Sequence, residues 1–176
     1  MTVYFDDNNY IQVQRQDGHH YITICAFYAG SDIYGTDIDF ILDTGAFITV
    51  ISRDIAREFG YDKLPKMSAK IKGYSGEVPA DFIRIPGLKV LEPLLTDIPV
   101  LIPVSSEYKQ NVLGLNVLEY FNYYLDTEND KLYLSKNPNP RPYREILACG
   151  GIFTIPHNYD VDDSEEDFST IQSFVL

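Results

Sequence analysis

The alternation of apolar and polar residues in the first part of the chain predicts β-strands. The segment YIQVQRQ from Tyr10 alternates, and HYITICAFY from His20 is rich in β-branched and aromatic residues. After the turn AGSDIYG, a third apolar pattern predicts a strand from Thr36 to Leu42 that forms a hairpin with the strand before it. This hairpin leads directly into Asp43.

Two helices are expected between the strands. Ser52 suits a helix N-cap, Asp54 suits the first turn and Gly60 suits the position just after a helix. Together these residues predict a short helix over 53–59. The spacing of leucine and phenylalanine predicts a second helix over 115–121.

The rest of the chain up to Lys136 again favours strands. MSAKIKGYSGEVPADFIRI predicts two strands around a turn at 73–76, and further strands are expected over 88–91 and 98–104. YYLDTENDKLYLS predicts a closing hairpin around 127–130. Three prolines favour edge positions for some of these strands: Pro93, Pro99 and Pro103.

Composition fits one globular domain and narrows its partners. The chain has 176 residues, of which 45% are hydrophobic, enough for one real core. Its net charge of −12 argues against nucleic acid and anionic membranes as partners. The start MTVYFDDNNY lacks signal-peptide features, and no apolar run is long enough to span a membrane. Cys25 in a strand pattern and Cys149 in a glycine-flanked loop suggest reduced thiols and a cytoplasmic location.

The composition changes after Lys136. NPNPRPYRE contains three prolines and is typical of a linker or an extended arm. The acidic end DVDDSEEDFSTIQSFVL is expected to be a solvated tail. The alternative is a docking segment that uses its apolar residues, namely Phe168, Ile171, Phe174 and Val175.

The stretch DFILDTGAFITVIS contains the strongest chemical signal in the chain. An apolar strand ends on Asp43, and a buried carboxylate is costly unless it has a partner. Thr44 supplies a hydroxyl, and Gly45 lets the backbone turn and approach another group closely. An ordinary Asx turn would also account for an Asp-x-Gly sequence, so these three residues do not decide the function.

The surrounding sequence resembles that of the retropepsin-like aspartic proteases, the single-lobe relatives of pepsin. ILDTGA, followed by an apolar run and Ser52, resembles their active-site loop. Val112-Leu113-Gly114 resembles the apolar-apolar-glycine segment that packs behind that loop, and a glycine-rich hairpin lies between the two. Many members have an acidic or polar residue two positions after that glycine, where this chain has Asn116. The resemblance covers residues 18–136.

The resemblance implies an all-β fold: a retropepsin-like barrel lobe with one or two short helices and a flap hairpin. Residues 1–17 and 137–176 fall outside the resemblance, and they are expected to form an N-terminal arm or strand and a linker with an acidic tail. Asp43, Thr44 and Gly45 would form the catalytic loop, with Leu113 and Gly114 packed behind it.

The number of Asp-Thr-Gly sequences determines the expected assembly. The chain contains one, because Asp126-Thr127 is followed by Glu128 and belongs to a predicted hairpin. A pair of carboxylates sharing one proton can act as both general acid and general base. The family's mechanism therefore implies a homodimer in which Asp43 of each subunit meets at the two-fold axis.

The resemblance also implies a polypeptide substrate and no cofactor. An extended peptide would bind as an added strand beneath the flap, with apolar subsites from Ile48, Val78 and Val104. The expected substrate-binding residues are Ala46, Gly73, Tyr74, Ser75 and Gly76.

Other functions compete with proteolysis. The chain could be a non-proteolytic module of the same fold that dimerises or binds a peptide or ligand. A metal site is disfavoured, because the adjacent residues His19 and His20 would point to opposite faces of a strand and His157 lies far away in sequence. Serine-hydrolase chemistry has no Gly-x-Ser-x-Gly motif to support it. The extensions could also wrap a partner subunit, cover the cleft or be trimmed by self-processing.

Overall fold

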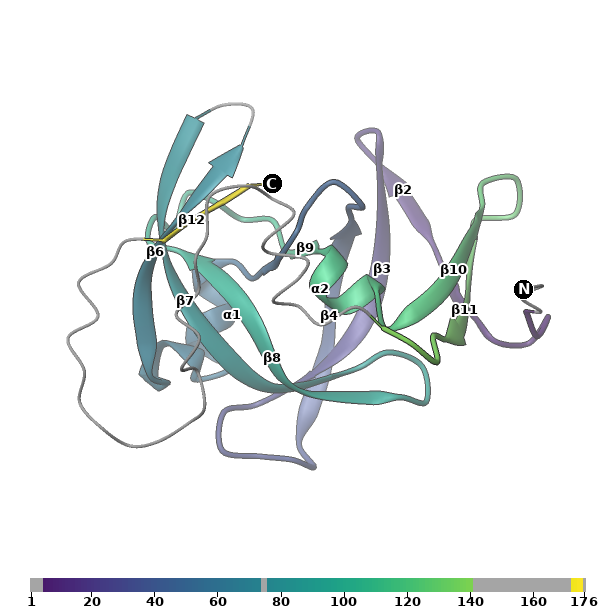
Figure 1. Ribbon diagram of the computed structural model, residues 1–176, viewed down its shortest axis with the longest axis horizontal. Helices are drawn as coiled ribbons and strands as arrows, with labels where there is room; N and C mark the ends of the chain where they lie inside the picture. Colours follow the sequence, from purple (N-terminus) through teal and green to yellow (C-terminus); the bar gives the residue numbers. More distant parts are fainter. Residues whose placement is uncertain (1–4, 74–75, 141–171, 176) are drawn as a thin grey trace.

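A closed ring of strands forms the centre of the computed structural model, which describes residues 5–73, 76–140 and 172–175 (Figure 1). The strands of the larger sheet run in the order β12-β6-β7-β8-β5-β9-β4-β3-β2, and a pairing between β7 and β3 closes the ring. A smaller sheet has the order β1-β11-β10. The bounds of the strands are β1 Tyr10–Gln12, β2 Gln14–Gln16, β3 His19–Phe27, β4 Gly35–Leu42, β5 Thr49–Val50, β6 Lys66–Gly73, β7 Gly76–Lys89, β8 Leu94–Pro103, β9 Val112–Leu113, β10 Phe121–Asp126, β11 Lys131–Lys136 and β12 Gln172–Val175.

The hairpin of β3 and β4 confirms the first strand predictions. The strands pair antiparallel from Tyr21 with Ile41 to Phe27 with Gly35. In β4, Ile38 and Phe40 are buried while Asp39 between them is exposed, as the alternating pattern requires. The hairpin therefore delivers the chain to Asp43 at the end of β4, as expected.

The alternating segment from Tyr10 forms two strands and not one. The chain changes sheets at Val13, which is buried and donates its amide to the carbonyl of Asp130. Before this residue β1 pairs with β11, and after it β2 pairs with β3. Burial of a single valine thus lets one extended segment join both sheets.

Two predictions about the central strands are wrong. The strand expected over 88–91 does not exist separately, because β7 continues through Leu88 to Lys89. β8 is not an edge strand, since it lies between β7 and β5. Its prolines are tolerated because β5 pairs with Val100 and Leu101, so Pro99 and Pro103 flank this short pairing without interrupting it.

The helices are short and fill the gaps between strands. α1 spans Arg53–Glu58, a 3₁₀ turn spans Tyr61–Lys63, and α2 spans Leu115–Leu118. Gly60 has a φ of 75°, which agrees with its expected place after the first helix. Ser52 occupies the N-cap position without a side-chain capping bond. α2 stops before the predicted residue 121, because Phe121 already pairs with Lys136 in the predicted closing hairpin.

The buried apolar side chains of the described residues form two clusters. The larger one fills the barrel and includes Ile22, Phe40 and Leu113. The smaller one, here called the loop–flap cluster, connects the segment after Asp43 with the β6–β7 hairpin. Its buried members are Ile41, Ala46, Ile48, Val50, Ala69, Ile71, Ala80, Phe82, Leu101 and Val112.

Part of the segment expected to be a solvated tail is a strand. β12 pairs in parallel with β6, with Gln172 opposite Ala69 and Val175 opposite Lys72. Figure 1 shows β12, in yellow, beside β6. Predictions for several other residues fall outside the described part of the chain: Tyr74, Ser75, Cys149, His157, Phe168 and Ile171.

Candidate active site

Asp43 lies where β4 ends and the chain begins to turn toward β5. β9 is inserted between these strands, parallel to β4 and antiparallel to β5. The amide of Asp43 donates to the carbonyl of Leu113 in β9 at 3.3 Å. The Asp43 side chain is half-buried, so the carboxylate is held at a fixed strand end while remaining accessible.

The loop after Asp43 holds that carboxylate from its own backbone. Asp43 Oδ1 accepts a hydrogen bond from the amide of Gly45 at 2.8 Å, and the amide of Ala46 donates to the Asp43 carbonyl at 3.3 Å. A Cβ atom at Gly45 would lie 3.2 Å from Asp43 Oδ1, closer than most real Cβ contacts. Thr44 and Gly45 are both exposed. The Asx turn that the sequence allowed is therefore present, and it orients the candidate catalytic oxygen.

Gly114 supports the loop from behind. A Cβ there would lie 2.6 Å from the carbonyl carbon of Ile48 and 2.8 Å from the amide of Thr49. This close approach lets the next two amides reach the loop: Leu115 N donates to the Ala46 carbonyl at 2.8 Å, and Asn116 N to the Phe47 carbonyl at 3.2 Å. The position requires glycine because backbone meets backbone.

A buried polar network extends this support. Asn116 Oδ1 accepts from the amide of Thr49 at 2.7 Å and from its hydroxyl at 2.9 Å, while Asn116 Nδ2 donates to the Pro99 carbonyl at 2.8 Å. The Thr49 hydroxyl oxygen in turn accepts from the amide of Gly114 at 3.1 Å. Asn116 and Thr49 are 1% and 0% exposed, so their polar groups depend on these bonds.

Two further residues beside the loop had no recognisable sequence signal. The Asn111 side chain donates to the Asp39 carbonyl at 3.0 Å and accepts from the amide of Ser52 at 2.8 Å, so it ties β4 to the start of α1. Tyr108 packs against the loop–flap cluster. Burial, and then the negative charge of Asp43, raise the pKa of the Tyr108 phenol. Asn116, by contrast, could be found from its place two residues after Gly114.

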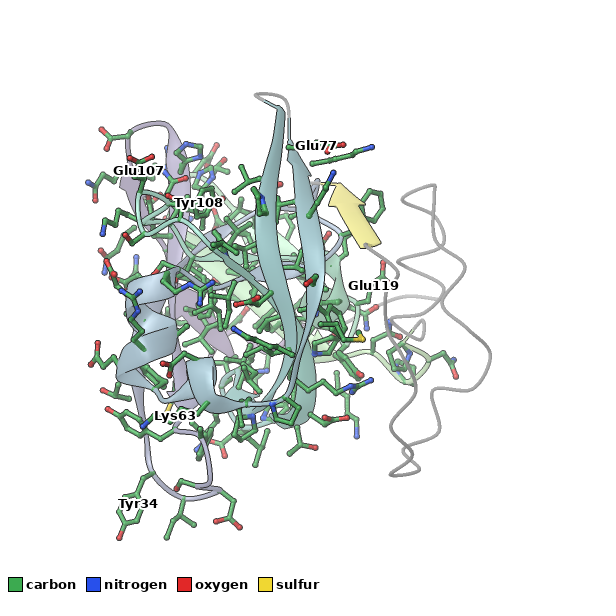
Figure 2. All side chains as sticks on the ribbon, turned by 90° about the vertical axis from the view of Figure 1, so that its left-hand side faces the viewer. Tyr34, Lys63, Glu77, Glu107, Tyr108 and Glu119 are labelled. Atoms are coloured by element: carbon green, nitrogen blue, oxygen red, sulfur yellow. The ribbon has the colours of Figure 1, made fainter. Side chains whose placement is uncertain are left out.

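The β6–β7 hairpin is the candidate flap. Gly73 and Gly76 form its last described pair, and Lys70 and Lys72 both make ion pairs with Glu77 at 3.1 Å. Figure 2 shows this hairpin upright, with Glu77 at its side and the loop of Tyr108 across from β12. Ala69 and Ile71 join the loop–flap cluster, so the hairpin packs onto the segment that carries Asp43.

The expected substrate-contacting residues differ in accessibility. Ala46 and Ile48 are 0% exposed, so their side chains belong to the core. Val78 is half-buried against the loop–flap cluster, and Val104 is exposed. The buried side chains of the loop therefore offer no surface for a substrate side chain. The accessible candidates for subsites in the single subunit are Val78, Val104 and Tyr108.

No group of three metal-ligating side chains gathers within the part of the chain that the structure describes. His19 and His20 are neighbours on β3, where Gln16 and Arg15 are their partners on β2. None of the described helices is long and apolar enough to cross a membrane.

The fold and the loop together define the class. A ring of strands with an Asp-Thr-Gly loop, a glycine packed behind it and a hairpin above it is the retropepsin-like aspartic protease fold. In agreement, a solved retropepsin-like aspartic protease from Rickettsia conorii matches with a TM-score of 0.53 and 25% sequence identity. The match covers 71% of this chain and 96% of the Rickettsia chain.

The family assignment follows from a second comparison. The model of the gag-polyprotein putative aspartyl protease family matches residues 30–120, a range that includes Asp43, the hairpin and Gly114. The chain belongs to this family. A comparison with curated proteins gives no match. Family and fold support protease function in general, and peptides as the class of substrate.

Proposed function

We propose that the protein is an aspartic endopeptidase that acts as a homodimer and hydrolyses peptide bonds with an Asp43 carboxylate from each subunit. The observation that carries the proposal is the arrangement at Asp43. Its carboxylate is half-buried at the end of a strand, is oriented by the amide of Gly45, and belongs to a chain of an aspartyl protease family.

The chemistry requires two carboxyl groups. A water molecule must lose a proton as it attacks the peptide carbonyl carbon, and the amide nitrogen must gain a proton before the carbon–nitrogen bond breaks. An ionised aspartate performs the first transfer and a protonated aspartate the second. Two carboxyl groups about 3 Å apart cannot both ionise, a situation for which aspartic proteases are the standard example.

A two-fold dimer would supply the second group. Each chain offers one Asp-Thr-Gly loop, and the exposed Thr44 and Gly45 leave the front of that loop open to a partner. In a symmetric interface the loop of one subunit would face the same loop of the other subunit, so each contact would occur twice, once from each side. The Thr44 hydroxyl would then donate across the axis to hold the two loops in place.

The substrate would be an extended polypeptide covered by the flap. The β6–β7 hairpin packs onto the loop–flap cluster, and its last described pair is Gly73 with Gly76. Closure of this hairpin over a bound strand would exclude bulk water from the carboxylates. Main-chain hydrogen bonds would supply affinity, and side-chain pockets would supply selectivity.

The test compares wild type with Asp43→Asn in cleavage of fluorescein-labelled casein and of a peptide library. We expect the variant to lose at least about 100-fold in rate, the size of a missing general acid–base group. Asp39→Asn, a change in an exposed residue of β4, the strand that leads to Asp43, is the matched control and should cleave like wild type. Sedimentation of both proteins should show dimers at assay concentration.

The competing function, a module that binds without cleaving, predicts a different outcome. Dimers that bind peptides but show no cleavage dependent on Asp43 would favour it. Cleavage by a species that sediments as a monomer at every concentration would refute the shared dyad.

A further inference from the structure

β12 occupies a position where an added peptide strand would be expected. β6 pairs with β7 on one side, and among the described residues its other edge is taken by β12. The four residues Gln172–Val175 lie opposite Ala69–Lys72, the last positions of β6 before Gly73 at the end of the hairpin. A segment distant in sequence is thus bound to the flap through its main chain.

This edge is connected to the candidate catalytic loop through the loop–flap cluster. Ala69 and Ile71, two of the residues opposite β12, lie in the loop–flap cluster with Ala46 and Ile48 of the loop. A strand paired with residues 69–72 therefore lies beside β6, whose side chains share this cluster with the segment after Asp43. Figure 2 shows β12 beside the upright hairpin, on the side opposite Tyr108.

The charges of the two segments are complementary. β6 carries three lysines, and two acidic residues of β7, Glu77 and Asp81, pair with them. The three lysines and these two carboxylates together carry one excess positive charge. The sequence before β12, DVDDSEED, contains six acidic residues and no basic residue. Long-range attraction would favour the return of β12 to β6 after it dissociates.

We infer that the outer edge of β6 is a docking edge for extended peptides and that Gln172–Val175 of the same chain is its resident occupant. A substrate strand that pairs with the outer edge of β6 needs the main-chain groups that β12 uses, so β12 must leave this edge before such a strand binds. This inference rests on the proposed function, since it concerns access to the same site. It makes β12 a built-in competitor of the substrate.

The size of the effect follows from the fraction of molecules with a free edge. If β12 is docked in about nine-tenths of the molecules, the apparent affinity for substrate is lowered about tenfold. Release of β12 should therefore raise kcat/KM by up to about tenfold, mainly through KM, because the carboxylates are unchanged.

The decisive experiment uses two serine-to-proline variants of the full chain. Ser173→Pro removes an amide within the paired segment and stiffens it, whereas Ser169→Pro makes the same chemical change outside β12. Hydrogen exchange of the residue 69–72 amides is measured in both, in an Asp43→Asn background that prevents cleavage. We expect faster exchange in Ser173→Pro and no change in Ser169→Pro.

The activity arm uses the same pair with Asp43 intact and labelled casein as substrate. Ser173→Pro should show the lower KM, and a synthetic peptide of residues 170–176 should restore the wild-type KM by competition.

Unchanged exchange together with an unchanged KM would overturn the inference while leaving the protease proposal standing. Faster exchange and peptide binding without any cleavage would keep the docking edge and reject the protease. A final arm mixes isotope-labelled Ser173→Pro chains with unlabelled wild-type chains. Slow exchange restored at residues 69–72 of the labelled chains would show that β12 comes from the partner subunit, and it would refute occupancy by the same chain.

Discussion

The loop that carries Asp43 and the hairpin above it are stabilised in opposite ways. The loop is held from behind by buried backbone contacts at Gly114 and by the Thr49–Asn116 network, whose side chains are almost inaccessible. The hairpin carries partly exposed ion pairs at Glu77 and ends on two glycines. Buried, satisfied polar groups specify one geometry, while exposed ion pairs contribute little to stability. The contrast favours a rigid floor, formed by the Asp43 loop, beneath a cover, the β6–β7 hairpin, that can open.

The largest effect is expected from Gly114→Ala. The added methyl would lie 2.6 Å from the carbonyl carbon of Ile48, so the loop or β9 must shift. We expect the free energy of unfolding to fall by about 3 kcal/mol, the upper range for overpacking. Urea denaturation followed by circular dichroism measures it.

The matching change in the hairpin is Gly76→Ala. Gly76 has a φ of +122°, and no atom of the described residues lies within 4 Å of an added Cβ, so backbone strain would be the main cost. A residue with a side chain in such a sparsely populated backbone region is strained by about 2 kcal/mol. Equal losses at the two glycines would contradict the contrast between floor and cover.

The second prediction concerns Asn116→Ala. The change would leave the Thr49 amide and hydroxyl and the Pro99 carbonyl without their partner in a dry environment. We expect a loss of about 2 kcal/mol in the free energy of unfolding, from unsatisfied buried groups. Asn122→Ala is the control: its side-chain bonds are long, at 3.4 and 3.5 Å, and it should cost below about 0.5 kcal/mol. A negligible effect at Asn116 would mean that water replaces its hydrogen bonds.

The third prediction tests whether Tyr108 senses the carboxylate of Asp43. Burial and then the charge of Asp43 raise the pKa of this phenol. Asp43→Asn should therefore lower the pKa of Tyr108, while burial keeps it above its ordinary value. Titration of the tyrosine ring signals by nuclear magnetic resonance measures it, with Asp39→Asn as the control of equal charge. If Tyr108 titrates identically in wild type and Asp43→Asn, the phenol is too far from the loop for one substrate to contact both Tyr108 and Asp43.

These contacts also show which features could be predicted from the sequence. The β3–β4 hairpin follows from alternation, and the Asp-Thr-Gly loop, Gly114 and the flap strands follow from motif and order. Alternation is a local property, so it could not show that Val13 moves the chain between two sheets or that β7 continues through Leu88. Asn111 and Tyr108 reach the loop through tertiary packing, which leaves no periodic signal.

The end of the chain shows the same limit in a different form. The acidic composition before β12 predicts a solvated segment, since charge opposes burial. The pairing of Gln172–Val175 with β6 depends on main-chain groups, which every residue except proline has in full. Composition therefore carries no information about that pairing.

The smallest effect is expected from Glu77→Gln in the hairpin. Hydrogen bonds from Lys70 and then Lys72 hold the pKa of Glu77 below its usual range. A lowered carboxyl pKa stabilises the hairpin at pH values above the usual range, and this contribution disappears as the pH falls through the lowered pKa. Because Glu77 is exposed, global stability should hardly change, whereas hydrogen exchange of the β6 and β7 amides should be faster than in wild type at neutral pH. The difference should vanish in acid, where wild type also lacks the charge.

Glu107→Gln, at an exposed position outside the hairpin, is the control and should leave the exchange of the hairpin amides unchanged at every pH. A difference that persists in acid would show that Glu77 acts through packing, and the cover would then resemble the floor more closely than its ion pairs suggest.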